Sequence, residues 1–202
     1  MKKVLITAFE PFNGQSLNAS SKILNQLNTT QFKAQIHKLI MPTVFTEVNA
    51  IMTSKIDEFK PDIILLIGEA GQASHIRLER VAINIDDARI PDNRHNQPIN
   101  LPININGETA YFSTLPIKTI HLDLLSQKIP AIISNSAGTF VCNHFMYVVL
   151  DYLTTKKASN IIAGFIHFPY IKAQIKNDNI PYLDIKSSVK ALEIIKKNCI
   201  NA

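Results

Sequence analysis

Cysteine is scarce in this chain and tryptophan is absent. The 202 residues include two cysteines, Cys142 and Cys199, which are too few for a disulfide-stapled secreted scaffold. Six glycines and ten prolines exclude collagen-like and low-complexity architectures. Charged residues make up only 18% of the chain and apolar residues 46%. This balance excludes a disordered protein, because so much apolar surface can offset the entropy lost on folding.

Long apolar runs are also missing. Runs such as Ile63–Ile67 are far shorter than the roughly 20 residues that a membrane helix needs, so we expect no membrane partner. The net charge of +5 comes with scattered lysines and no basic-plus-aromatic motif, so we expect no nucleic-acid partner. The segment Met1–Ile6 meets Glu10 too soon for a signal peptide and reads as a first strand. These features predict a cytoplasmic protein with reduced thiols.

Short apolar runs alternate with segments of helical periodicity, which predicts an α/β fold with a largely parallel sheet. The expected strands are Lys3–Ala8, Lys33–Ile40, Asp62–Gly68, Ala131–Asn135 and Asn160–His167. The expected helices are Asn18–Leu27, Thr43–Lys60, Pro116–Gln127, Phe140–Thr155 and Asp184–Lys197. In the second of these helices, the apolar side chains that share one face at helical spacing are Val44, Val48, Ile51, Ile56 and Phe59. Pro116 suits a first helical turn, and Asp184 suits an N-cap.

One stretch, from Arg77 to about Tyr111, shows alternating residues and turn signals but no helix. It predicts a strand followed by a hairpin-like insertion around 77–111. Long non-helical insertions in compact domains often carry function. No linker, repeat or change in composition divides the chain, so we expect residues 1–202 to form a single domain.

Two reactive residue types follow neighbouring predicted strands. Cys142 comes at the start of a predicted helix, where unpaired backbone N–H groups and the helix dipole favour an anion and so the nucleophilic thiolate. His167 ends the next strand, and ligands of open α/β sheets bind beyond the carboxyl ends of strands. A cysteine–histidine pair assembled there suits nucleophilic catalysis. The alternative for each residue alone is a structural role in the core.

A catalytic histidine needs a third group to orient it, and Glu79 is the candidate. Its alternative is a surface ion pair with the neighbouring arginines. His144 is a rival base, but residues two apart on a helix do not face each other, so we expect a packing or hydrogen-bonding role for it. The histidines show no metal-ligand spacing, and no phosphate loop or dinucleotide fingerprint is present, so we expect neither metal nor cofactor.

Three segments together resemble the pyrrolidone-carboxyl peptidases, the pyroglutamyl peptidase type I family of cysteine peptidases. The first, Ser134–His144, reads SNSAGTFVCNH and looks like the family's nucleophile motif. The second runs from Glu79 through Pro91, Asp92 and Asn93 and is similar to its glutamate motif. The third, Gly164–Tyr170, matches its histidine motif. The opening Phe9-Glu10-Pro11-Phe12 and Asn18 fit its N-terminal signature, and the matches span nearly the whole chain in the family's order.

This resemblance implies an α/β/α sandwich, a homotetramer and hydrolysis of the amide after an N-terminal pyroglutamyl residue of peptides. Cys142 would then be the nucleophile, His167 the general base and acid, and Glu79 the orienting carboxylate. Phe9, Phe12 and Phe140 would line the lactam pocket, since a flat neutral ring suits aromatic walls. The remaining substrate-binding positions implied are Asn18 and Glu69. The alternative for the phenylalanines is core packing.

The chain departs from the family's usual residues at three places. Asn13 stands where the family generally has a glycine, and Glu69 stands where it usually has a glutamine. The arginine that family members tend to have near Ala73 is missing. Glu69 is harmless if only its backbone meets the lactam, but its carboxylate would alter binding if its side chain approached the substrate. Two alternative functions remain: a relative that binds lactam-capped peptides without cutting them, and a thiol amidase of other acyl specificity. Cys199 has no histidine at a useful spacing and is expected to be incidental, or at most a contact between subunits.

Overall fold

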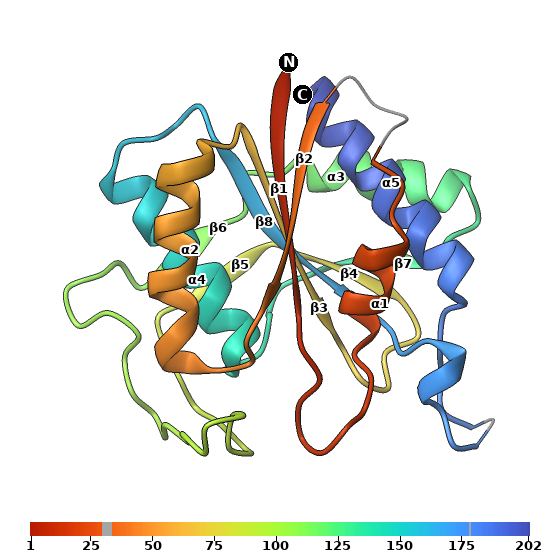
Figure 1. Cartoon of the computed structure of the whole chain (residues 1–202), viewed down its shortest axis with the longest axis horizontal. Coiled ribbons are helices and arrows are strands. Elements are labelled where there is room, and N and C mark those ends of the chain that lie inside the picture. Colours follow the sequence, from red (N-terminus) through yellow and green to blue (C-terminus); the bar gives the residue numbers. More distant parts are fainter. Residues whose placement is uncertain (30–33, 178) are drawn as a thin grey trace.

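A six-stranded main sheet in the order β2-β1-β3-β8-β4-β7 forms the middle layer of the fold (Figure 1). The computed structural model describes residues 1–29, 34–177 and 179–202. The strands of the main sheet are β1 (Lys2–Phe9), β2 (Ala34–Met41), β3 (Ile63–Glu69), β4 (Ile76–Glu79), β7 (Ala131–Ser134) and β8 (Ile162–Phe168). Each of the five predicted strands is present within a residue or two of its expected bounds; Lys33, the expected start of the second, lies outside the described residues.

Helices cover both faces of this sheet and make the fold a three-layer α/β/α sandwich (Figure 1). They are α1 (Ala19–Gln26), α2 (Phe45–Phe59), α3 (Ile117–Ser126), α4 (Val141–Thr155) and α5 (Ile185–Asn201), with a short 3-10 helix η1 (Lys172–Gln174). Apolar residues of α1, α3 and α5 pack on one face, and those of α2 and α4 on the other. Strand β3 is buried along Ile63–Gly68, as expected for a strand covered on both sides.

The predicted helices are confirmed, with small corrections. Ile51, expected on the buried face of α2, is 36% exposed, and Met52 is buried instead. Pro116 precedes α3 as its N-cap and does not lie in its first turn. Asp184 caps α5 as expected, since its side chain accepts a hydrogen bond from the Ser187 N–H. No described helix is long and apolar enough to cross a membrane.

The direction of the last strands corrects one step of the sequence argument. Strands β2, β1, β3 and β8 are parallel, but β4 runs antiparallel to β8 and parallel to β7. The strand before Cys142 therefore points away from the edge at which His167 lies. Segment 135–140 brings the chain back to that edge before α4 begins. Cys142 and His167 therefore come together because segment 135–140 leads back to this edge, and not because two neighbouring parallel strands end side by side.

The non-helical insertion is shorter than expected, because β4 belongs to the main sheet. The hairpin consists of the antiparallel strands β5 (Val81–Ile83) and β6 (Ala110–Phe112). Between them, residues 84–109 form a long loop that we call the excursion, tied together by an isolated bridge between Asp86 and Leu101. In Figure 1 it is the green loop at the lower left, beyond α2 and α4.

Candidate active site

His167 and Glu79 meet where the parallel and antiparallel parts of the main sheet join. His167 of β8 pairs in register with Arg77 of β4. Glu79 lies two residues further along β4, so its side chain is on the same face of the sheet. The Nδ1 atom of His167 is 2.8 Å from Oε1 of Glu79. The structure thus joins the expected base and its expected orienting carboxylate directly.

The carboxylate of Glu79 is fully buried, which excludes the alternative of a surface ion pair. Among the described residues its second oxygen, Oε2, has no hydrogen-bond partner. A buried carboxylate with one unsatisfied oxygen is costly unless a cation stands beside it. Glu79 therefore favours the protonated, positively charged form of His167.

Cys142 lies in the first turn of α4, directly after Val141 where the helix begins. The N-cap, Phe140, has an extended backbone and offers no side-chain cap. Helix starts expose backbone N–H groups that attract an anion, so this position suits a thiolate. The side chain of Cys142 is partly exposed, whereas that of Cys199 is buried. Of the two thiols, Cys142 is the one a substrate can reach.

Gly68 lets the sulfur of Cys142 approach the sheet. A Cβ atom at Gly68 would stand 3.2 Å from Sγ of Cys142 and 2.6 Å from Cζ of Phe165. Gly68 is also the register partner of His167 in β8. The thiol therefore packs against bare backbone beside the histidine, and a side chain at position 68 would separate them.

The charge state of His167 follows from these neighbours. Burial by itself would lower the pKa of His167, since it disfavours the imidazolium. The negative charge of Cys142 and hydrogen bonds to Cys142 and Glu79 outweigh burial and raise the pKa of His167 to about 9. At neutral pH His167 is therefore positively charged beside the sulfur of Cys142, and a neighbouring cation favours the thiolate form in which a cysteine attacks an acyl carbon.

His144 is engaged elsewhere. Its Nδ1 atom lies 2.8 Å from Oδ2 of Asp86, and its ring contacts the edge of Phe45 at a centroid distance of 5.5 Å. The expected hydrogen-bonding and packing role is confirmed by these contacts. Within the part of the chain that the structure describes, no three His, Cys, Asp or Glu side chains gather into a possible metal site.

Aromatic rings surround the start of α4. The rings of Phe12 and Phe140 lie 6.0 Å apart, and Phe45 meets Phe140 edge-on at 5.3 Å. Phe12 and Phe140 are partly exposed, as walls of a pocket would be. Phe9, by contrast, is 2% exposed and packs between Phe145 and Phe165. Contact between Phe9 and a substrate therefore stays a prediction, while its packing behind the site is observed.

Asn18 is the N-cap of α1 and is fully buried. Its Oδ1 atom accepts hydrogen bonds from the N–H and the hydroxyl of Ser20, and its Nδ2 atom donates to the Glu10 carbonyl. These bonds fix the loop that carries Phe12. They favour a positioning role for Asn18, and its direct contact with a substrate stays a prediction.

Glu69, at the end of β3, ties two elements to the sheet. Its Oε2 atom accepts from the Ala19 N–H at 2.6 Å and from Nε2 of Gln174 at 2.5 Å. Burial raises the pKa of Glu69, and these two hydrogen bonds oppose the shift. The carboxylate is directed at α1 and η1, which favours the alternative in which only the backbone of residue 69 would meet the lactam.

The sequence signature of the pyroglutamyl peptidases matches residues 2–201. The chain belongs to this family. Among its relatives, pyrrolidone-carboxylate peptidase 1 of Caldanaerobacter subterraneus is 48% identical over 201 residues, covering 99% of this chain and 98% of that protein. A pyrrolidone-carboxylate peptidase of Clostridium perfringens is 50% identical over 193 residues, covering 95% and 90%.

Solved structures of pyroglutamyl peptidases have the same fold. Pyroglutamyl peptidase I of Bacillus amyloliquefaciens superposes with a TM-score of 0.94 at 39% identity, covering 100% of this chain and 98% of that one. Pyrrolidone carboxyl peptidase of Thermococcus litoralis gives 0.95 at 37% identity, covering 100% and 94%. The family resemblance and the fold class predicted from the motifs are thereby confirmed, and the chain is a cysteine-type hydrolase.

Two departures from the usual pyroglutamyl peptidase residues have local explanations. Asn13 has a φ of 51°, in the left-handed region that favours glycine, and asparagine is among the residues that adopt it most readily. The turn it forms is closed by a hydrogen bond from the Gln15 N–H to the Phe12 carbonyl. Ala73 is 4% exposed, so a small side chain fits this position.

Sequence reasoning missed three residues that shape the site. Phe45 supports Phe140 and touches His144, and Gly68 admits the sulfur. Asn143, fully buried beside the nucleophile, holds the backbone of β5 with its side-chain amide. Asn143 stands next to Cys142 within the nucleophile motif, and this position indicated a possible role in the site. Nothing in the sequence singled out Phe45, because the residues it contacts are far from it along the chain.

Proposed function

We propose that this chain removes N-terminal pyroglutamyl residues from peptides, with Cys142 as nucleophile, His167 as acid and base, and Glu79 as the orienting carboxylate. The observation that carries the assignment of roles is the buried hydrogen bond from His167 to Glu79 beside a partly exposed cysteine at a helix start. Family membership supports the substrate class. A relative that only binds would have no need of a histidine–carboxylate pair placed beside a thiol that a substrate can reach.

In the first half-reaction the Cys142 thiolate attacks the pyroglutamyl carbonyl carbon, and a sulfur–carbon bond forms. The tetrahedral oxyanion meets backbone N–H groups in the first turn of α4. The carbon–nitrogen bond then breaks as the His167 imidazolium donates its proton to the leaving amine. The products are a thioester on Cys142, a neutral His167 and a peptide shortened by one residue.

In the second half-reaction the neutral His167 takes a proton from water, which attacks the thioester. The sulfur–carbon bond breaks and pyroglutamate leaves, and the thiolate and imidazolium are restored. Glu79 holds the ring of His167 in one orientation and stabilises its positive charge in both half-reactions.

The lactam ring of the substrate would lie against Phe12 and Phe140. The ring is uncharged, so aromatic walls and backbone hydrogen bonds suffice, and no carboxylate is needed to hold an amine. Phe9 would support this pocket from the core, and Asn18 and the backbone of Glu69 would complete it. We further propose a cytoplasmic homotetramer: the free thiols suit a reducing compartment, and the assembly rests on the family resemblance.

A panel of chromogenic amides tests the proposal. Pyroglutamyl amide should be cleaved, while prolyl and glutamyl amides, which carry a charged amine, should resist. The Cys142→Ser variant should lose about 10³-fold or more of the rate. Absence of turnover on every pyroglutamyl substrate would defeat the proposal, and preference for another acyl group would make the chain a thiol amidase of different specificity. If sedimentation shows only monomers, the proposal of a tetramer is wrong.

A further inference from the structure

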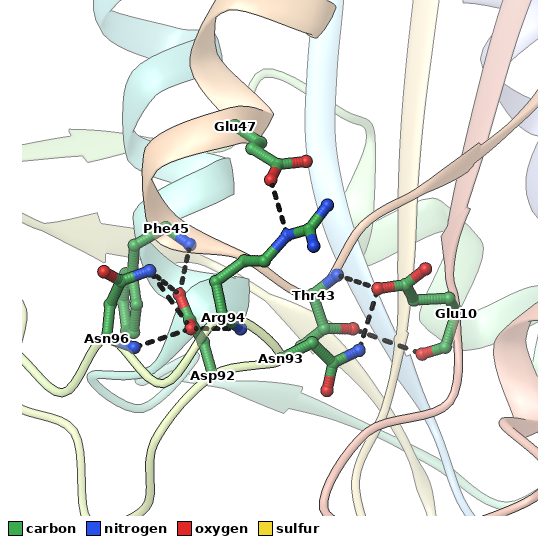
Figure 2. A network of polar contacts seen from close by, with 8 residues as sticks. All are labelled: Glu10, Thr43, Phe45, Glu47, Asp92, Asn93, Arg94 and Asn96. Carbon is green, nitrogen blue, oxygen red and sulfur yellow. Dashed lines mark hydrogen bonds and ion pairs between the residues drawn. The ribbon is translucent and has the colours of Figure 1, made fainter.

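The turn at residues 92–96 of the excursion is hydrogen-bonded to two elements that carry Phe12 and Phe45, rings in or beside the proposed lactam pocket, which we call the aromatic pocket (Figure 2). One is the start of α2, and the other is the loop after β1. The mechanism above gives no role to the segment Pro91-Asp92-Asn93, although it lies within the glutamate motif of the sequence. Figure 2 shows the side chain of Asp92 directed at the start of α2 and that of Asn93 directed at Glu10 in the loop after β1.

Asp92 fixes the start of α2. It is 4% exposed, and its Oδ2 atom accepts a hydrogen bond from the Phe45 N–H at 3.0 Å. Its Oδ1 atom closes the turn by accepting from the N–H groups of Arg94 and Asn96. Burial would raise the pKa of Asp92, but the hydrogen bonds from Asn96, Phe45 and Arg94 outweigh it and hold the pKa below its usual range. Asp92 thereby holds Phe45 in place, and the ring of Phe45 packs edge-on against that of Phe140.

Asn93 fixes the loop after β1. Its Nδ2 atom donates to Oε1 of Glu10 at 2.8 Å and to the Pro11 carbonyl at 2.9 Å. Oε1 of Glu10 also accepts from the Thr43 N–H, and the Asn93 N–H donates to the Thr43 carbonyl. Pro11 immediately precedes Phe12. One amide side chain from the excursion therefore holds the backbone next to a wall of the pocket.

We propose that Asn93 and Asp92 are positioning residues that set the spacing of the aromatic pocket, Asn93 through Pro11 and Phe12, and Asp92 through Phe45 and Phe140. This inference rests on the proposed function, since the pocket matters only if the lactam ring enters it. Neither side chain needs to touch the substrate or the reacting atoms. Their loss should weaken binding of the ring and leave the chemistry at Cys142 intact.

The Asn93→Ala variant tests the inference, because Asn93 is exposed and its replacement leaves the core unchanged. Losing the two hydrogen bonds should raise KM for a pyroglutamyl amide about fivefold, with kcat within about twofold of the native value. Asn93→Asp places a carboxylate against Glu10 and should raise KM further. The matched control is Arg94→Ala on the same turn, whose exposed side chain pairs with Glu47; its KM should not change.

A second readout does not depend on turnover. Alkylation of Cys142 by pyroglutamyl chloromethyl ketone requires the pocket, whereas alkylation by iodoacetamide does not. In Asn93→Ala the first rate should fall about fivefold and the second should stay the same. The Phe12→Ala variant should lose the selectivity for the lactam reagent. Adding Asn93→Ala to it should cause little further loss of selectivity, because Asn93 is expected to act on the pocket by positioning Phe12.

Three results would overturn the inference. The first is an unchanged KM and lactam selectivity in Asn93→Ala, and the second is an equal fall in both alkylation rates, which would indicate general disruption of the site. The third is additive losses in the Phe12→Ala double variant. Failure of the proposed function has a different signature, because the native chain itself would then show neither turnover nor preference for the lactam reagent.

Discussion

The charge of His167 depends on two neighbours that differ in kind. In the proposed mechanism, Cys142 supplies a negative charge that is consumed when the thioester forms, whereas Glu79 takes no part in bond formation. The histidine would lose a proton to the leaving amine and later regain one from water. A carboxylate that does not react, next to a thiolate that does, would let the imidazole change protonation state while its ring stays in place.

Glu79→Gln should lower kcat about 10²- to 10⁴-fold, by the loss of an orienting charge. The native rate should fall above about pH 9, where His167 loses its proton, because the leaving amine then lacks a donor. Glu79 is one cause of the raised pKa, so the variant's alkaline limb should move to lower pH. The measurement is the pH profile of kcat/KM.

Asp86→Asn is the matched control for that profile, because it alters a second histidine–carboxylate pair, the one between Asp86 and His144. The alkaline limb should stay in place in this variant. A Glu79→Gln enzyme with a native rate and an unmoved alkaline limb would show that the carboxylate is not the orienting group.

The two cysteines should differ in reactivity. Cys199 is 1% exposed, and burial raises the pKa of its thiol to about 12. Iodoacetamide at about pH 7 should therefore label one thiol in the folded native chain, and peptide mapping should place it on Cys142. Cys142→Ser should take up no label until it is unfolded, and Cys199→Ala should label like the native chain. Comparable rates at both thiols would contradict the assignment.

At the scale of elements, a buried amide joins the beginning of the excursion to α4, the helix that carries Cys142. Asn143 of α4 accepts from the Ile83 N–H and donates to the carbonyls of Ile83 and Ile85, at 2.9 to 3.1 Å. These bonds join β5, and with it the beginning of the excursion, to the residue after Cys142. The excursion in turn holds the loop of Phe12. The pocket and the nucleophile therefore share one set of supports.

Asn143→Ala should destabilise the fold by about 2–4 kcal/mol, because it leaves buried backbone groups of β5 without partners. Urea unfolding measures this cost. The control is Asn198→Ala, whose amide bonds to the exposed Asp123 and to its own helix; it should cost less than about 1 kcal/mol. A cost for Asn143→Ala no greater than for the control would show that the excursion is held by other contacts.

Glu69→Gln should make the fold more stable at neutral pH. Folding raises the pKa of Glu69, so this group favours the folded state while it is protonated and its contribution is lost as the pH rises through the folded pKa. Glutamine removes the buried charge and keeps an acceptor for the Ala19 N–H.

The gain in Tm should appear above about pH 4.3, the ordinary pKa of glutamate, and vanish in more acidic solution. Glu108→Gln, at an exposed carboxylate, is the control and should show no such dependence. A variant less stable than the native chain at pH 7 would mean that the charge-assisted bonds to Ala19 and Gln174 outweigh burial.

The spacing of apolar residues predicted where the helices and strands lie, but not the direction of every strand in the sheet. Helix and strand positions follow from local apolar spacing, which is why α2 and β3 were found within two residues of their bounds. Whether β4 runs with or against β8 depends on pairing between residues far apart in the chain, and no local pattern encodes it. The same limit applies to Ile51 and Met52, neighbours on a helix whose burial is decided by how α2 docks.

At the scale of the whole molecule, the fold places the site at the edge of the sheet where β1, β3 and β8 end. In Figure 1 both chain termini are at the opposite edge. The proposed catalytic residues could be named from sequence because each lies in a contiguous motif. The hydrogen bonds from Gln174 to Glu69 and from Asn93 to Pro11 could not be predicted, because they join segments that only the folded chain brings together.

The most direct test of the account is to trap the acyl-enzyme. An activated pyroglutamyl ester, mixed with the native chain and quenched in acid, should leave a pyroglutamyl group that intact-mass and peptide analysis places on Cys142, since a good leaving group makes acylation outrun hydrolysis. Cys142→Ser should carry no thioester. Turnover without an adduct, or an adduct on another residue, would contradict the account.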